Sequence, residues 1–192
     1  MFDIKLSKYI NIVFPYGSRV YGTNSETSDY DYIIVSSIGY DPPKPNITYY
    51  SKKEFQDKIN EHEISALECI FLPGEYYQEI SKQFTFELDL PKLRSSISSK
   101  ASNSWVKAKK KFTIEKDKDI YIGKKSLFHS LRIIDFGIQI ARYKKIVDYS
   151  CTNDIWFEIR DNPSEDYNDY KTKYQPIYNS KMTEFRKLAP KE

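Results

Sequence analysis

The stretch YINIVFPYGSRVYGTNSETSDYDYIIVS, residues 9–36, decides the fold of this chain. Residues 9–15 form a short apolar run that ends at a Tyr-Gly-Ser turn, a pattern that predicts a buried strand. Residues 30–36 concentrate β-branched and aromatic side chains, so they predict a second buried strand. The stretch therefore predicts two buried strands, joined by a glycine-led turn and a polar loop.

The following residues predict a third strand and a capped helix. A proline-rich connection, residues 39–46, leads into ITYY, which is typical of a strand. Ser51 then begins a helix, because Glu54 three residues later completes a capping box. A further apolar segment, residues 64–72, stops at a Pro-Gly pair.

Beyond about residue 91 the composition shifts to Ser and Lys, which indicates a boundary there. A long helix is predicted from residue 124 to about 146, with Leu127, Leu131 and Ile134 on its apolar face. The C-terminal part is expected to form short helices or loops. Together these segments predict an α+β fold. A polar stripe also follows the long helix and contains Lys125, His129, Arg132 and Gln139.

Composition narrows the class of protein. The 30 basic and 27 acidic residues leave a net charge of +3, so any nucleic-acid site must be local. Two distant cysteines fit a reducing compartment better than a disulfide-stapled secreted domain. Neither a signal peptide nor an apolar run of membrane-spanning length is visible. We therefore expect a soluble, intracellular (cytoplasmic) protein without a membrane partner. The sequence leaves its oligomeric state open.

The polar loop between the first two strands carries the chemistry. Gly17 and Ser18 open a turn whose backbone amides and hydroxyl can hold phosphate oxygens. Asp29 and Asp31 lie at i and i+2 of the second strand, so their carboxylates are expected on one face. Carboxylates beside a phosphate suit magnesium, or manganese in its place. Either piece alone is common on protein surfaces, whereas the combination, with Ser28 before the first aspartate, predicts a triphosphate and metal site.

The segment GSRVYGTNSETSDYDYIIV resembles the signature of the DNA polymerase β-like nucleotidyltransferases, a Gly-Ser followed after a loop by Asp-x-Asp. Within them it is similar to the predicted nucleotidyltransferases associated with RNA ligases in RNA repair. The likeness extends to ALECIFLP and to the Lys-rich helix that carries His-x-x-Arg, and covers roughly residues 10–160.

The resemblance implies a palm-like mixed sheet flanked by helices in residues 1–90. It also implies a helical region, residues 91–192, that packs on this core and completes the nucleotide or acceptor groove. Its chemistry would be metal-assisted transfer of a nucleoside monophosphate, with ATP or another nucleoside triphosphate as substrate and magnesium as cofactor. An RNA end is one acceptor that it leaves open.

The sequence departs from that family at the third carboxylate. In the narrower group this residue would precede the capped helix, where Asn46 stands here. An asparagine can coordinate a cation through its carbonyl oxygen, but it cannot act as a general base. Glu68 or Asp41 could substitute for it. Glu68 lies in an apolar stretch, where a structural pairing is favoured over a catalytic role.

Several basic residues have two interpretations. Arg19 either reaches a phosphate or packs over the loop. Lys125, His129 and Arg132 either clamp a γ-phosphate or an acceptor backbone, or form a solvated polar face. The run KAKKK, residues 107–111, either binds a nucleic-acid backbone with Trp105 available for stacking, or is a solvated helix face. His62, between two glutamates, is expected at the surface.

Three functions remain open from the sequence. The first is an enzyme that transfers a nucleotide to an RNA end or another hydroxyl acceptor. The second is an antitoxin-type transferase that attaches AMP to a protein tyrosine. The third is a non-catalytic nucleotide sensor, which the departure at Asn46 motivates. Neither the base nor the acceptor can be read from the sequence.

Overall fold

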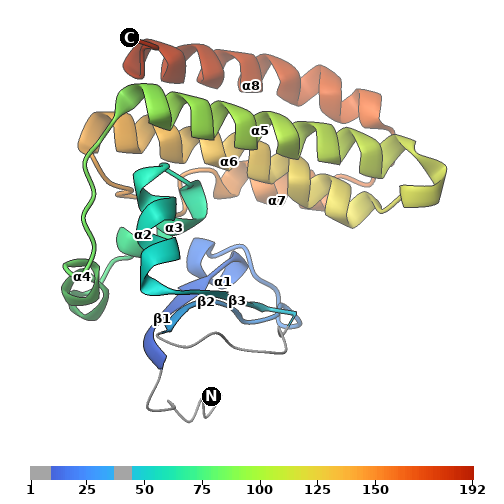
Figure 1. The fold of residues 1–192 in the computed structure, drawn as a ribbon. Helices are drawn as coiled ribbons and strands as arrows, with labels where there is room; N and C mark the ends of the chain where they lie inside the picture. Colours follow the sequence, from blue (N-terminus) through green and yellow to red (C-terminus); the bar gives the residue numbers. More distant parts are fainter. Residues whose placement is uncertain (1–9, 37–44) are drawn as a thin grey trace. The chain divides into compact units, whose positions relative to one another are not determined.

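The computed structural model describes residues 10–36 and 45–192 of the chain. It has an α+β fold: a three-stranded mixed sheet with helices is followed by a long helical region (Figure 1). The chain divides into two compact units, Met1–Glu87 and Leu88–Glu192, called unit 1 and unit 2 below.

The sheet of unit 1 has the strand order β1-β2-β3. Its strands are β1 Ile10–Tyr16, β2 Asp31–Ser36 and β3 Ile47–Tyr50. Strand β1 runs antiparallel to β2, whereas β3 runs parallel to β2, so the sheet is mixed. The last four residues of β2 are all buried, as expected of a central strand that is covered on both faces.

The described part of unit 1 also contains the helices α1 Ser18–Tyr21, α2 Lys52–Asn60, α3 Ile64–Ile70 and α4 Glu75–Ser81. The predicted capping box of α2 is confirmed: the Glu54 amide donates to Ser51 Oγ at 3.1 Å, and the Ser51 amide donates to Glu54 Oε2 at 2.7 Å. From α2, Phe55 stacks on Phe14 of β1 with ring centroids 5.5 Å apart. The helix is thereby fixed against the sheet.

The expectation that His62 lies at the surface is wrong. Its side chain is only 1% exposed, and its ring packs against Phe86 with centroids 5.3 Å apart. Its backbone has a φ of 57°, and Nδ1 lies 3.2 Å from the Asn60 carbonyl oxygen. The flanking glutamates misled the prediction, because Glu61 is exposed and Glu63 is partly exposed while His62 between them is buried.

Unit 2 is helical. Its elements are α5 Leu90–Thr113, the short 3-10 helix η1 Glu115–Asp117, α6 Ile120–Tyr143, α7 Asn153–Asp161 and α8 Tyr167–Leu188. Helices α5, α6 and α8 pack side by side, and α7 packs on α6 (Figure 1). Within the described ranges, no helix is both long enough and apolar enough to cross a membrane.

Helix α6 is longer at its start than the sequence indicated. It begins at Ile120, because the Asp119 side chain accepts the Ile122 amide and caps the first turn. It ends at Tyr143, where Lys144 turns the backbone into the left-handed region with a φ of 58°. The predicted apolar face is buried as expected; it includes Leu127, Leu131 and Ile134.

The prediction of short helices or loops in the C-terminal part holds for α7 and the loops around it, but it is wrong for α8. Helix α8 is continuous over 22 residues and contains Pro176 in its interior. Its buried residues Tyr167, Tyr170 and Tyr174 recur at helical spacing, so packing of this face outweighs the hydrogen bond that the proline cannot donate.

Candidate nucleotide and metal site

The glycine turn and the second aspartate of the predicted site lie against each other. Tyr16 pairs with Asp31 across β1 and β2, so Gly17, the next residue, begins its turn beside Asp31. Gly17 has a φ of 82° and precedes α1 as its N-cap. A Cβ built on Gly17 would overlap Oδ2 of Asp31 and lie 3.1 Å from its Cγ. Only a glycine fits between this turn and this carboxylate.

Ser18 is the first residue of α1. Its carbonyl oxygen accepts the Thr23 amide at 2.9 Å, while its hydroxyl has no hydrogen-bond partner within residues 10–36 and 45–192. The first amides of a helix have no carbonyl inside the helix to bind. The turn therefore offers a hydroxyl and backbone donors at a position next to Asp31.

Asp29 lies outside the strand. Strand β2 begins at Asp31, and Asp29 is an exposed residue of the preceding loop. The alternation of side chains, which predicts that both carboxylates share one face, thus applies only from Asp31 onward. Convergence of the two carboxylates stays a prediction.

Arg19 packs over that loop. Its Nη2 donates to the Ser28 carbonyl oxygen at 2.7 Å, and its Nε donates to the Asp29 carbonyl oxygen at 3.3 Å. Its guanidinium also lies 3.8 Å from the ring centroid of Tyr30. These contacts agree with the second of the two interpretations of Arg19. Its role as a phosphate ligand stays a prediction.

The Ser28 hydroxyl also holds the loop. It accepts the Ser25 amide at 2.8 Å and lies 3.1 Å from the Ser25 hydroxyl. The side chain therefore shapes the turn that delivers Asp29, and the structure gives it a local partner other than a nucleotide.

Asn46 lies beside Asp31 at the same end of the sheet. The Tyr32 amide donates to the Asn46 carbonyl oxygen at 2.9 Å, and Tyr32 pairs with Ile47 in the parallel register. Extending this register by one residue brings Asn46 opposite Asp31. This is the neighbouring-strand position at which the sequence resemblance implies a third metal ligand. Asp41, the other substitute considered, falls outside the described residues.

Glu68 has a structural partner. It is 2% exposed in α3, and the hydroxyl of Tyr21 donates a short hydrogen bond to its Oε2. Tyr21 is the last residue of α1, so this bond fixes the helix that follows the Gly17 turn. Burial, with the Glu68 charge as a second cause, raises the pKa of the adjacent Cys69 thiol well above its usual value.

In unit 2, two of the three predicted clamp residues are bonded to each other. Nη2 of Arg132 lies 2.6 Å from Nδ1 of His129. Arg132 is 4% exposed, and its guanidinium lies 5.4 Å from the Phe128 ring and 5.6 Å from the Phe136 ring. Lys125 is exposed and its Nζ lies 5.3 Å from the Tyr121 ring.

The environment of His129 keeps its imidazole neutral. Burial lowers the pKa of His129 well below its usual value, and nearby positive charges lower it further. These charges belong to Arg132, Lys100, Lys107 and Lys125. Because Arg132 can only donate, Nδ1 accepts and the single proton of the ring is on Nε2. His129 is thus a hydrogen-bond donor surrounded by cations.

Lys100 and Lys107 come from α5, and sequence reasoning did not connect them with His129. No local pattern could have done so, since their proximity depends on the packing of α5 against α6. Helical spacing does place Lys100 and Lys107 on one side of α5, because they are seven residues apart.

Gln139, the last residue of the predicted polar stripe, has a structural role. Its Oε1 accepts the Val147 and Asp148 amides, each at 2.8 Å, and its Nε2 donates to the Asp148 carbonyl oxygen at 2.9 Å. The side chain therefore secures the loop after α6, and it does not extend the basic cluster.

The lysine run 107–111 lies on α5, but the neighbouring indole is engaged. Trp105 is half-buried and packs against Tyr178 with ring centroids 4.9 Å apart. Lys111 pairs with Asp117 at 2.5 Å. The expectation that Trp105 is available for stacking is therefore not supported, whereas Lys107 remains exposed.

No group of three or more His, Cys, Asp or Glu side chains that could hold a metal occurs among the residues that the structure describes. A cation at Asp31 would need other oxygens, and the Asn46 amide, Asp29, a phosphate or water have the required chemistry. Asp31 has the chemistry to contribute one oxygen ligand to such a cation, and the other ligands would have to come from these groups.

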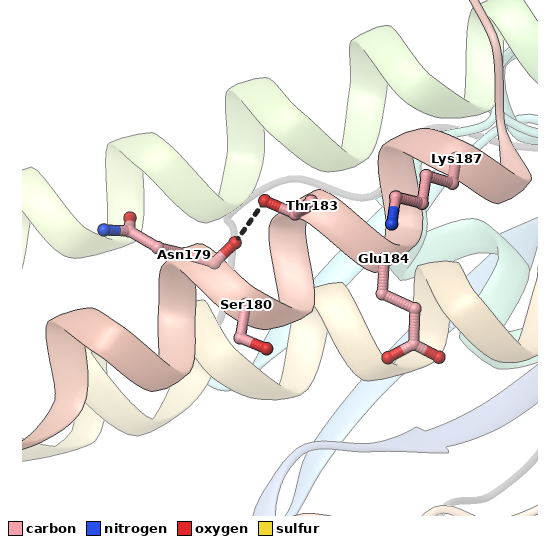
Figure 2. A pocket seen from close by; sticks show the side chains of 5 residues that line it. All are labelled: Asn179, Ser180, Thr183, Glu184 and Lys187. Carbon is pink, nitrogen blue, oxygen red and sulfur yellow. Dashed lines mark hydrogen bonds between the residues drawn. The ribbon is translucent and has the colours of Figure 1, made fainter.

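The lining of a hollow on the surface of unit 2 contains none of the predicted site residues. Figure 2 shows its lining, which comes entirely from α8: Asn179, Ser180, Thr183, Glu184 and Lys187. Its volume is about 390 Å³. The Thr183 hydroxyl donates to the Asn179 carbonyl oxygen at 2.8 Å, and Glu184 pairs with Arg142 at 2.5 Å. Of its polar side chains, Thr183 thus bonds to α8 itself and Glu184 bonds to α6.

Comparison of the chain with models of protein families, with curated proteins and with solved structures finds no match in any of the three.

Proposed function

We propose that the chain is a magnesium-dependent nucleotidyltransferase that transfers a nucleoside monophosphate from a nucleoside triphosphate to a hydroxyl acceptor. The observation that carries this proposal is the contact between Gly17 and Asp31, in which a Cβ would overlap the carboxylate. A bare backbone turn beside a carboxylate can approach phosphate oxygens and share a cation with them. We also propose that the chain is related to the polymerase β-like enzymes that its sequence resembles, and that it is cytoplasmic.

The residues of unit 1 would divide the work of binding. The Ser18 hydroxyl and the first amides of α1 would donate to phosphate oxygens, while Asp31 and Asp29 would hold magnesium or manganese. The bound cation would neutralise the negative charge that develops on the departing pyrophosphate.

The transfer itself forms one bond and breaks one. The acceptor hydroxyl oxygen bonds to the α-phosphorus, and the bond from that phosphorus to the β-phosphate bridging oxygen breaks, so pyrophosphate leaves. The hydroxyl proton must pass to a base, and the Asn46 amide cannot accept it. Water would take it, because Asp29 and Asp31 would be engaged by the cation.

A non-catalytic nucleotide sensor is the second candidate, and the position of Asn46 favours it. Asn46 lies next to Asp31, where a third carboxylate would complete the acidic set. With an amide there, a triphosphate and a cation can still bind, but proton removal from the acceptor lacks a carboxylate. This function predicts tight binding of triphosphate without release of pyrophosphate.

The test is magnesium-dependent release of pyrophosphate from each of the four nucleoside triphosphates. The Asp29→Ala and Asp31→Ala variants are expected to lose at least about a hundredfold in rate. Glu26→Ala is the matched control, because Glu26 is an exposed carboxylate of the same loop. A wild-type rate that the aspartate variants leave unchanged would reject the proposal. Labelled protein, rather than labelled RNA, after incubation with ATP would indicate the protein-AMP alternative.

A further inference from the structure

Two aromatic rings are exposed on neighbouring helices of unit 2. Tyr121, in the first turn of α6, is 52% exposed, and Phe157 of α7 is 38% exposed. Tyr121 packs against the buried Trp156 of α7 with ring centroids 6.3 Å apart, and Phe157 is the next residue of α7. Because a buried neighbour holds it at the surface, the Tyr121 ring is preorganised for stacking.

Each exposed ring has a cation beside it. Lys125 Nζ lies 5.3 Å from the Tyr121 centroid, and the guanidinium of Arg160 lies 5.1 Å from the Phe157 centroid. Arg160 is also paired with Asp161 through hydrogen bonds of 2.7 and 3.0 Å, so its charge is largely neutralised locally. The lysine is therefore the more effective cation of the two.

Polar side chains continue along one side of α6 from Tyr121. Tyr121, Lys125, His129 and Arg132 are spaced by three or four residues, which places them on the same side of the helix. Lys107 of α5 acts on His129 together with Lys125, so it lies near the same strip. Within residues 10–36 and 45–192, neither Lys107 nor Lys125 forms an ion pair with a carboxylate.

The length of this strip favours a chain over a single nucleotide. From residue 121 to residue 129 the axis of α6 advances about 12 Å, at 1.5 Å per residue. One strand of stacked nucleic acid carries a phosphate about every 3.4 Å, so the strip matches several phosphates in a row. A lone triphosphate would occupy only part of it.

We propose that the strip formed by Tyr121, Lys125 and His129, with Lys107 and Phe157 beside it, binds single-stranded nucleic acid; the buried Arg132 positions His129. Lys107 and Lys125 would pair with backbone phosphates, and the Nε2 proton of His129 would donate to a phosphate oxygen. Tyr121 and Phe157 would stack on unpaired bases, whose faces a duplex does not offer.

Single-stranded nucleic acid would then be the class of acceptor for the transfer. As an acceptor the strand rests on the proposed function, whereas binding of the strand to unit 2 does not depend on it.

The test is binding of the full chain to a fluorescein-labelled single-stranded RNA of about 12 nucleotides, followed by fluorescence anisotropy without nucleotide or divalent metal. Lys107→Gln and Lys125→Gln are each expected to weaken binding about three- to tenfold. Each should also reduce the slope of log affinity against log salt by about 0.7. Tyr121→Ala should weaken binding by between about fivefold and a hundredfold.

Matched controls come from residues of the same unit that lie outside the strip. Lys171→Gln, on α8, removes the same charge from an exposed lysine, and Tyr143→Ala removes a ring that is 54% exposed at the end of α6. Both are expected to bind the RNA like the wild type. Equal losses in the control and strip variants, absence of binding, or equal affinity for the matching duplex would overturn the proposal.

A further variant separates this proposal from the proposed function. The Asp29→Ala, Asp31→Ala double variant is expected to keep wild-type RNA affinity. If the wild-type protein binds RNA through the strip but releases no pyrophosphate, only the proposed transferase activity is rejected. If the protein releases pyrophosphate but does not bind RNA, only the proposal that unit 2 binds single-stranded nucleic acid is rejected.

Discussion

The carboxylate of Asp31 occupies the space that a side chain on Gly17 would need. A Cβ at residue 17 would overlap Oδ2 and stand 3.1 Å from Cγ, and the Gly17 backbone has a φ of 82°. Two separate constraints therefore select glycine: the left-handed backbone conformation and the close approach of an acidic group.

Replacing Gly17 tests that contact. Gly17→Ala is expected to cost about 1–2 kcal/mol in free energy of unfolding from the backbone alone. Because the new methyl group also displaces the Asp31 carboxylate, pyrophosphate release should fall about a hundredfold. Denaturant unfolding and the release assay measure the two effects separately.

Gly74→Ala is the matched control. Gly74 also has a positive φ, 106°, but a Cβ there would meet only Tyr77 Cδ2 at 3.9 Å, an ordinary contact. This variant should lose stability without losing activity. Similar activity in both variants would show that the carboxylate does not depend on the turn.

Asn46→Asp tests the missing carboxylate. A third acidic group next to Asp31 would strengthen metal binding and could accept the proton of the acceptor hydroxyl. We expect about a tenfold rise in pyrophosphate release, since general-base catalysis contributes at least this much. Robust turnover by the wild type would exclude the sensor. A variant slower than the wild type would show that the amide is required as it stands.

Arg19 and Tyr30 are expected to stabilise the loop as a pair. Their stacking at 3.8 Å predicts a coupling energy of about 0.5–1 kcal/mol in a double-mutant cycle with Arg19→Met and Tyr30→Leu, measured by urea unfolding. A measurement of triphosphate affinity tests the other interpretation of Arg19, in which its guanidinium binds a phosphate. If Arg19 binds phosphate, Arg19→Met weakens that affinity and Tyr30→Leu does not.

His129 makes the stability of the protein depend on pH. Its pKa is lowered in the folded chain, so the unfolded chain binds a proton first as the pH falls. The free energy of unfolding should therefore decrease below pH about 6.5, by at most about 1.4 kcal/mol per pH unit, until the folded state is also protonated. At higher pH the histidine contributes no dependence.

His129→Gln should remove this component of the dependence. Urea unfolding at several pH values measures it, and NMR titration can follow the ring directly, since the chain has only two histidines. A His129 ring that titrates near its usual pKa would contradict the neutral donor described above.

Much of unit 1 could be predicted because its signals are local. The apolar runs, the proline-rich connection and the capping box of Ser51 and Glu54 each lie within a few consecutive residues. Helix α5 gave no such signal. Its buried face includes small residues, Ala101 and Ala108, among many serines and lysines, so its apolar period is weak in the sequence.

The candidate site was predictable only in part, for a related reason. Gly17 and Asp31 are brought together by the pairing of two adjacent strands, which their motif anticipates. By contrast, the contact of Arg19 with the loop carbonyls and the approach of Lys107 to His129 depend on the path of the backbone and on helix packing. Neither leaves a pattern in consecutive residues.

The strand register limits how this protein can change. Tyr16 pairs with Asp31 and Tyr32 pairs with Ile47, so both edge strands fix their alignment at the same end of β2. Adding or deleting one residue within β1 or β3 would turn all its side chains from that point to the opposite face. The polar loop between residues 22 and 28 carries no ladder pairing, so length variation is expected to accumulate there and to be excluded from the strands.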